Sequence, residues 1–250
     1  MSKLIKLEMR NLFKQKSLLI CFIISTSLVV IGILASNLLN KMAADAGQTD
    51  ILLGVNAFDS LVGYLSGGNI TLLLSIVISI YFGYEASDGT VKNIIGKGYK
   101  RSEFFISKVI SVIMTTIFLI IITIFFNYLL CFIMGIHIDS FSVDHLVKII
   151  VLSFGIIAEV VMFSSLSFII FRTGANIVAN ICIPLLFPLA LTLFDVLAKL
   201  NIKISDFWIE NTYALVINNS KLPFVTIVSI CYIIIFIALG ITLTKRKEIK

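Results

Sequence analysis

The sequence predicts an all-α integral membrane protein, a single transmembrane domain over residues 1–250 that crosses the bilayer six times. Hydrophobic residues make up 59% of the chain, charged residues make up 14%, and the mean hydropathy is +1.08. Soluble domains usually hold about 45–50% apolar and about 25% charged residues, so a soluble core would not accommodate this excess. Because each span needs about 20 apolar residues, a chain of 250 residues has room for about six.

Runs of about 18 or more mainly apolar residues mark the predicted transmembrane helices. Residues 51–65 are also apolar, but Asp50, Asn56, Asp59 and the Gly67-Gly68 pair interrupt them. We therefore expect this stretch at the outer surface or dipping into it, and the start of the second span stays open between residues 51 and 69. The six predicted spans are residues 17–39, 69–84, 109–136, 146–171, 175–198 and 223–243.

The positions of Lys and Arg predict the orientation. Of the 20 basic residues, 15 flank one set of alternating span ends, and most of the aspartates lie on the opposite side. The positive-inside rule places this set in the cytoplasm, together with both termini. The net charge of +6 thus follows the membrane spans, and we expect no nucleic acid as a partner.

Residues 1–16 are predicted to form an amphipathic helix that lies along the inner leaflet. A basic flank that happens to be helical is the alternative interpretation. At 100° per residue the sequence forms two stripes. The apolar stripe holds Ile5, Met9, Leu12 and Phe13, and the basic stripe holds Lys3, Lys6, Arg10 and Lys14.

The outer segment before the last span begins with acidic and aromatic residues, in the stretch 205–210. This composition suits a short helix at the level of the lipid headgroups. We expect Trp208 and Tyr213 to anchor it there.

The longest cytoplasmic connection, residues 85–108, is predicted to project a short helix. Asp88 is a suitable N-cap, and Gly96 and Gly98 can supply the positive φ that ends the helix. The stretch is not a P-loop, because Gly98 stands where Ser or Thr is needed and Val91 where Gly is needed. The sequence also lacks HExxH and a Ser-centred G-x-S-x-G, so we expect no enzyme activity in this chain, and no metal site.

The order of these parts resembles a type-2 ABC transporter permease, nearly over the whole chain in topology and over about 25 residues in motif. The motif runs from an acidic residue through Gly-Thr and apolar residues to Gly and Arg. The resemblance implies that this loop is a coupling helix that docks into a groove of a separate ATPase subunit; an ordinary capped loop is the alternative. The coupling residues would be Glu85, Asp88, Gly89, Thr90, Lys92, Asn93, Ile94, Ile95, Gly96, Gly98 and Arg101.

The resemblance also implies partners. Two cytoplasmic ATPase subunits would carry ATP and Mg, and this chain would bind no cofactor directly. A second permease copy would complete the transporter in a bacterial cytoplasmic membrane. The small size and the absence of a large outer domain are similar to exporters of amphipathic peptides, including phenol-soluble modulin exporters and lantibiotic self-protection permeases.

Five residues within the spans are candidates for the translocation pathway or its gate. Glu159 lies near the middle of a predicted span, where a carboxylate needs a partner, water or a proton. It contacts a cationic substrate, takes part in gating, or packs as a neutral or hydrogen-bonded group. Asn176 and Asn180 form a polar stripe that could join helices, and Pro184 and Pro188 share one face and could kink the fifth span.

Two other classes of function stay open. One is an ion- or proton-coupled secondary transporter in which Glu159 titrates, although no repeat is evident and such proteins usually carry several charges within the membrane. The other is a membrane anchor or sensor subunit that transports nothing.

Overall fold

The computed structural model describes residues 1–45, 56–87, 96, 98–138, 142–170, 172–198, 203–218 and 221–246. Over these residues the chain is helical, apart from turns and one isolated bridge between Asn56 and His137. The elements are α1 (Ser2–Lys14), α2 (Lys16–Asp45), α3 (Ala57–Ser66), α4 (Asn69–Ser87), α6 (Arg101–Ile133), α7 (Val143–Ile170), α8 (Thr173–Ala198), η2 (Ile204–Phe207), α9 (Ile209–Ile217) and α10 (Leu222–Arg246).

Five of these helices, α2, α6, α7, α8 and α10, are each long and apolar enough to cross a membrane. The pair α3 and α4, bent by 41° at its junction, makes a sixth crossing when it is counted as one span. The all-helical prediction is thus confirmed for the described residues, and the five to six candidate spans compare with the six that were predicted. The predicted second span, 69–84, corresponds to α4, and residues 57–66 before it form α3.

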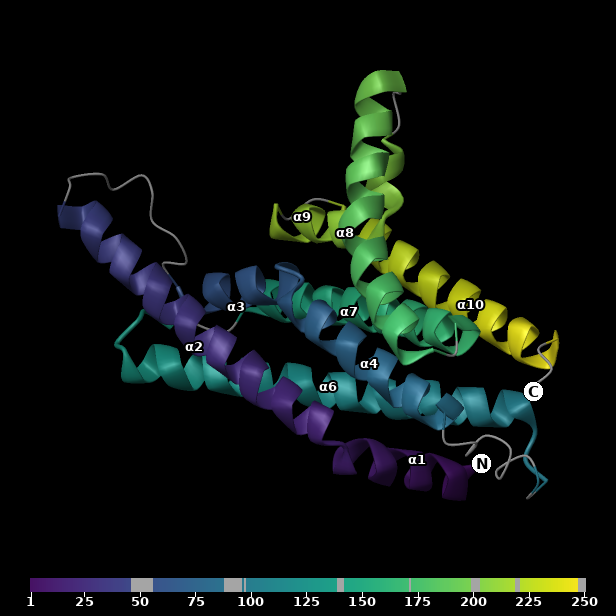
Figure 1. The fold of residues 1–250 in the computed structure, drawn as a ribbon. Coiled ribbons are helices and arrows are strands. Elements are labelled where there is room, and N and C mark those ends of the chain that lie inside the picture. Colours follow the sequence, from purple (N-terminus) through teal and green to yellow (C-terminus); the bar gives the residue numbers. More distant parts are fainter. Residues whose placement is uncertain are drawn as a thin grey trace.

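The centre of the bundle is α7, which packs against α3, α4, α6, α8, α9 and α10. In its most apolar window 56% of the residues are buried, the largest share among the spans. Figure 1 shows α4, α6, α7 and α10 running alongside one another, with α1 and the end of α10 at the same end of the bundle. We call this end the basic end, because Lys and Arg gather there, and the other the far end.

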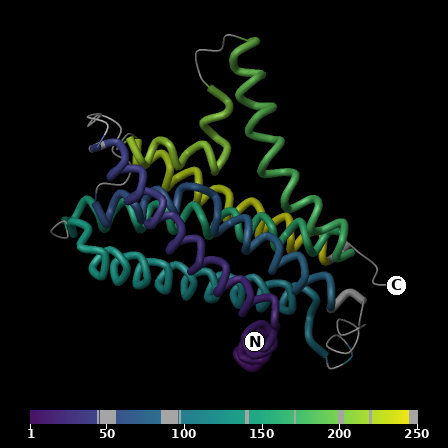
Figure 2. The backbone as a smooth tube through the Cα atoms, turned by 60° about the vertical axis from the view of Figure 1, so that its left-hand side comes forward, coloured from purple at the N-terminus to yellow at the C-terminus, as the bar shows by residue number. Residues whose placement is uncertain are grey.

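Helix α8 leaves the bundle. In both Figure 1 and Figure 2 it rises steeply away from the other spans, and only 11% of its most apolar window is buried. Its first half packs against α4 and α7, with Asn176, Asn180 and Pro184 buried. The helix continues through Pro184 and Pro188 without a break. Its second half exposes large apolar side chains, including Leu186, Leu189, Leu193 and Leu197.

Helix α1 crosses the spans at a steep angle, since Figure 2 shows it end-on while α4 and α6 run across the view. It packs against α6 and α2. Its buried stripe is Leu4, Glu8 and Leu12, spaced by four residues. Of the predicted apolar stripe, Leu12 is buried and Phe13 is 45% exposed, and Glu8, which the stripe left out, is fully buried.

The junction between α3 and α4 depends on a glycine. Gly68 has a φ of +71°, in the left-handed region that other residues avoid. The hydroxyl of Thr71 donates a hydrogen bond of 3.0 Å to the Gly68 carbonyl. On the other side of the turn, Asn127 on α6 donates to Ser60 on α3 at 3.1 Å, which holds α3 against the bundle. The bend is therefore built into the chain.

Replacing Gly68 with alanine should strain the junction. The left-handed conformation costs a residue with a Cβ atom about 1–2 kcal/mol, whereas space is not limiting, because the nearest atom to such a Cβ is 3.9 Å away. We expect Gly68→Ala to lower the melting temperature of the purified protein in detergent. Gly63→Ala, inside α3 and with nothing within 4 Å of its Cβ, is the matched control and should raise or keep it. Equal melting temperatures for both variants would contradict the strained turn.

Candidate functional site

The predicted coupling residues lie mostly outside the described part of the chain. This holds for Asp88, Gly89, Thr90, Lys92, Asn93, Ile94 and Ile95. Glu85 belongs to the last turns of α4, and Arg101 is the first residue of α6. Gly98, just before α6, has a φ of +88°. The structure therefore places the two stems of the predicted coupling loop, α4 and α6, at the basic end.

A buried polar cluster joins α1 to both stems. The carboxylate of Glu8 on α1 lies 3.5 Å from the ammonium of Lys108 on α6, and the two side chains are 0% and 1% exposed. The Tyr81 hydroxyl on α4 donates a short hydrogen bond to the same carboxylate oxygen of Glu8. Lys108 also lies over the Tyr81 ring, 3.6 Å from its centroid. We call Glu8, Tyr81 and Lys108 the stem cluster.

The stem cluster holds α1, α4 and α6 together through buried charged and polar groups. Away from water, an unpaired charge costs several kcal/mol, so Glu8 and Lys108 stabilise each other only while the three helices stay together. The aromatic face of Tyr81 adds a cation–π contact to the ammonium. The stem cluster thus joins α1 to both stems of the loop.

Sequence reasoning missed this cluster. Lys108 was counted as one of the cytoplasmic charges, and Glu8 was left out of the amphipathic pattern because hydropathy groups it with the exposed residues. One signal was present: Glu8 is the single acidic residue among the first 16, and it lies four residues from both Leu4 and Leu12.

A second polar group lies at the core of the far half of the bundle. Glu159 on α7 is 0% exposed, and the Tyr213 hydroxyl on α9 donates to it at 2.9 Å. Gly155, one turn before Glu159, makes room for this tyrosine, since a Cβ there would lie 2.5 Å from the Tyr213 ring. Burial, and the carboxylate of Glu159, raise the pKa of Tyr213 well above its ordinary value, so the phenol stays a donor.

The segment after α8 carries this tyrosine inward. Asp195, near the end of α8, accepts hydrogen bonds from the backbone N–H groups of Ile204 and Ser205 at 2.9 and 2.8 Å. These bonds fix the start of η2 and turn α9 onto α7. Trp208 and Tyr213 are 8% and 2% exposed, so the prediction that they anchor at the headgroups was wrong. The buried carboxyl group of Glu159 needs a hydrogen-bond donor, which explains why Tyr213 points inward.

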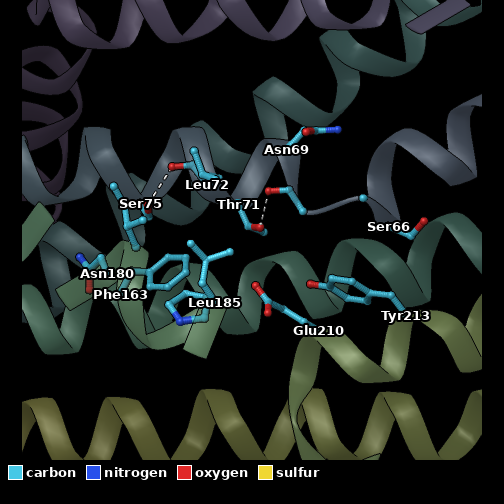
Figure 3. A pocket seen from close by; sticks show the side chains of 14 residues that line it. Ser66, Asn69, Thr71, Leu72, Ser75, Phe163, Asn180, Leu185, Glu210 and Tyr213 are labelled. Carbon is cyan, nitrogen blue, oxygen red and sulfur yellow. Dashed lines mark hydrogen bonds between the residues drawn. The ribbon is translucent and has the colours of Figure 1, made fainter. Parts of the chain in front are cut away.

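Between α4, α7, α8 and α9 the structure forms a cavity of about 270 Å³. Figure 3 shows the Glu210 carboxylate among its lining side chains, with the Tyr213 hydroxyl beside it in this view. The Trp208 indole donates to Glu210 at 3.4 Å. Burial raises the pKa of Glu210, and the bond from Trp208 opposes this. The lining comprises Ser66, Gly67, Gly68, Asn69, Thr71, Leu72, Ser75, Phe163, Asn180, Ile181, Pro184, Leu185, Glu210 and Tyr213.

Some of the predicted pathway residues line this cavity and others do not. Asn180 and Pro184 line it, and Glu159 lies behind its Tyr213 wall. Asn176 lies outside the lining and donates to the carbonyl of Ser167 on α7 at 3.2 Å. Pro188 also lies outside the lining. Sequence reasoning passed over Glu210 as a site residue because it belongs to the predicted surface helix.

Removing one member of the stem cluster should unfold the basic end. We expect Glu8→Gln and Lys108→Met each to destabilise the protein by about 3–5 kcal/mol, because each leaves a buried charge without its counterion. The double variant should lose less unfolding free energy than the two single variants lose together. A double-mutant cycle in detergent would measure this difference. Lys6→Met, at an exposed position of α1, is the control and should be neutral. Strict additivity would contradict the pair.

The bond between Glu159 and Tyr213 gives a second test. Tyr213→Phe leaves a buried carboxyl oxygen without its donor and should cost about 1–3 kcal/mol of stability. Glu159→Gln keeps an acceptor for the tyrosine and should cost much less. Thermal unfolding of both purified variants measures the difference. If Glu159→Gln is as damaging as Tyr213→Phe, a charge on Glu159 is part of the fold.

Comparison with known proteins agrees with this architecture. The sequence model of a protein family, described as ABC-2 family transporter protein, matches residues 4–194, more than three quarters of the chain. No curated protein matches the sequence significantly. The matched region runs from α1 to the second half of α8 and so includes the stem cluster, both stems of the loop and Glu159. The chain is a multi-pass membrane protein that belongs to the ABC-2 transporter family, as a non-catalytic transmembrane permease subunit of an ABC exporter.

Proposed function

We propose that this permease exports amphipathic peptides across a bacterial cytoplasmic membrane, as a pair of copies driven by two cytoplasmic ATPase subunits. ATP and Mg would bind to those subunits, and the loop between α4 and α6 would receive their movement. The termini and this loop would lie in the cytoplasm, as the 15 basic residues at alternating span ends favour.

The observation that carries the proposal is the stem cluster. A coupling element must pass a displacement of a few ångströms to the spans, which requires stiff attachment on both sides of the loop. Tyr81 and Lys108 lie on the two stems, and Glu8 holds both. Helix α1 would thus act as a brace along the inner leaflet, and a push on the loop would move α4 and α6 together.

The exposed half of α8 supports a second copy as partner. Its apolar side chains leave the bundle, and its first half stays attached to α4 and α7. Two such helices from two copies would bury each other's apolar faces and enclose a path between the permeases. Lipid would also cover an apolar helix, but the separation of α8 from its own bundle favours a second copy (Figures 1 and 2).

Peptide as substrate is supported by the mixture of groups beside α8. Leu72, Leu185 and Phe163 offer apolar surface, and Glu210 offers negative charge. An amphipathic, cationic peptide has the complementary surface.

One observation favours a different class. A broken span beside a buried carboxylate, here α3–α4 and Glu159, is also the design of ion-coupled secondary transporters. In such a protein export would depend on the ion gradient and not on an ATPase. The two classes make opposite predictions for the following experiment.

Deleting the partner ATPase should abolish export. We expect a tagged permease to co-purify with a P-loop ATPase, and peptide efflux from cells to be lost when that ATPase is deleted. Efflux that survives the deletion and stops when the proton gradient is dissipated would support the secondary transporter instead.

The coupling loop should be needed for activity and not for insertion. Replacing Gly89-Thr90 together with Ile94-Ile95 should reduce the ATPase rate of the reconstituted complex to that of the ATPase subunit alone, because the docking surface is lost. The control replaces Ser140-Phe141, in the connection between α6 and α7, which should leave stimulation intact. Normal stimulation by the Gly89-Thr90, Ile94-Ile95 variant would disprove the role of this loop.

A further inference from the structure

The hydroxyl groups that line the cavity between α4, α7, α8 and α9 can accept hydrogen bonds from a ligand but have no free proton to donate. Four of the lining residues carry hydroxyl groups, and all four donate their proton within the protein. Ser66 donates to the Val62 carbonyl at 2.7 Å, Thr71 to Gly68 at 3.0 Å, Ser75 to Leu72 at 2.7 Å, and Tyr213 to Glu159 at 2.9 Å. What these hydroxyls still offer to a ligand is acceptor lone pairs.

Asn180 adds a second, independent acceptor. Its side chain is 1% exposed and lines the cavity, and its Nδ2 donates to Ser79 at 2.9 Å and to Ser167 at 2.8 Å. The Ser79 proton already goes to the Ser75 carbonyl at 2.6 Å, so the contact with Ser79 requires the amide nitrogen on that side. The amide oxygen, Oδ1, is then left without a hydrogen-bond partner among the described residues.

The charged groups at the cavity are negative, and so they also favour a ligand that donates hydrogen bonds. Glu210 lines it directly, and Glu159 lies behind Tyr213, with its Oε2 atom lacking a partner within the described chain. Among the described lining residues none is Lys, Arg or His. The amide of Asn69 is exposed at the rim, so it does not change the character of the interior.

A ligand that matches this interior must donate hydrogen bonds and carry positive charge. An ammonium group has three donors and no acceptor, whereas a carboxylate or phosphate would meet only acceptors. The volume of about 270 Å³ lies at the small end for ligand pockets, which suits one side chain with a few waters better than a whole peptide. The apolar wall of Phe163, Pro184 and Leu185 suits an alkyl stem.

We infer that this cavity binds a protonated alkylamine, the lysine side chain of an exported peptide, with Glu210 as counterion. The inference rests on the proposed function for the identity of the ligand. It goes beyond that function because it assigns the recognised group, its counterion and the place of recognition between the broken span and α8.

Binding to the purified permease alone tests the site. The probes are a fluorescently labelled amphipathic peptide that contains lysines, and the same peptide with every lysine acetylated. We expect the wild-type protein to bind the lysine peptide at least about tenfold more tightly than the acetylated one, because acetylation removes the charge and two donors. Anisotropy in detergent gives both dissociation constants.

Two variants of Glu210 and one control complete the test. Glu210→Gln, which is isosteric and keeps an acceptor for Trp208, should remove most of the preference for the lysine peptide. Glu210→Lys places an ammonium of the chain's own in the cavity and should do the same. Asp206→Asn removes a nearby acidic residue that does not line the cavity, and should bind like the wild type. Size-exclusion profiles identify variants that fold.

The outcomes separate this inference from the proposed function. If the wild-type protein binds both peptides equally, or if folded Glu210→Gln keeps the full preference, the ammonium site is disproved even where efflux depends on the ATPase. If the preference is present and lost in Glu210→Gln, the site stands even where efflux survives deletion of the ATPase. Pentylammonium chloride should compete with the lysine peptide for the wild-type protein, and failure to compete would also disprove the site.

Discussion

Hydrocarbon offers no hydrogen-bond partner, so a polar group in the spans depends on the protein itself for one. Along α6, Ser111 donates to the Ser107 carbonyl and Thr115 donates to Ser111, each at 2.9 Å, so their hydroxyls serve their own helix. Groups that cannot do this need a partner on another helix. Glu8, Glu159, Asn127 and Asn180 each have such a partner, and these four contacts link α1, α3, α4, α6, α7, α8 and α9. These contacts help to fix the registers of the helices that they join.

The same constraint explains what the sequence could predict. Apolar length determines a span, so α6, α7, α8 and α10 follow from hydropathy. Polar pairing depends on residues far apart in the chain, and hydropathy carries no information on it. Lys108 counts as a cytoplasmic charge by position, yet it is buried because Glu8 lies 100 residues away in sequence and 3.5 Å away in space. Tyr213 looks like an interfacial anchor until Glu159 is known to face it.

The candidate site shows the same division. Glu159, Asn180 and Pro184 could be chosen from sequence, because a carboxylate, an amide or a proline inside an apolar run is conspicuous. Glu210 could not, because it lies outside the spans and reaches the cavity only after Asp195 has turned the segment 204–217 back onto α7. The Gly67-Gly68 pair was visible as an interruption, but its effect, a bend of 41° between α3 and α4, depends on the packing of α3 on α6 and α7.

The attachment of α8 has a mechanical consequence. Its first half is fastened to α4 and α7 through Asn176 and Asn180, and its second half, from Leu185 to Ala198, is about 21 Å long at 1.5 Å per residue. The second half is fastened as well, because Asp195 accepts hydrogen bonds from the start of η2 and Phe187 stacks on Trp208. A shift of α4 at the foot of α8 would therefore be passed along the helix to η2 and α9, the segment that carries Glu210 and Tyr213 to the cavity.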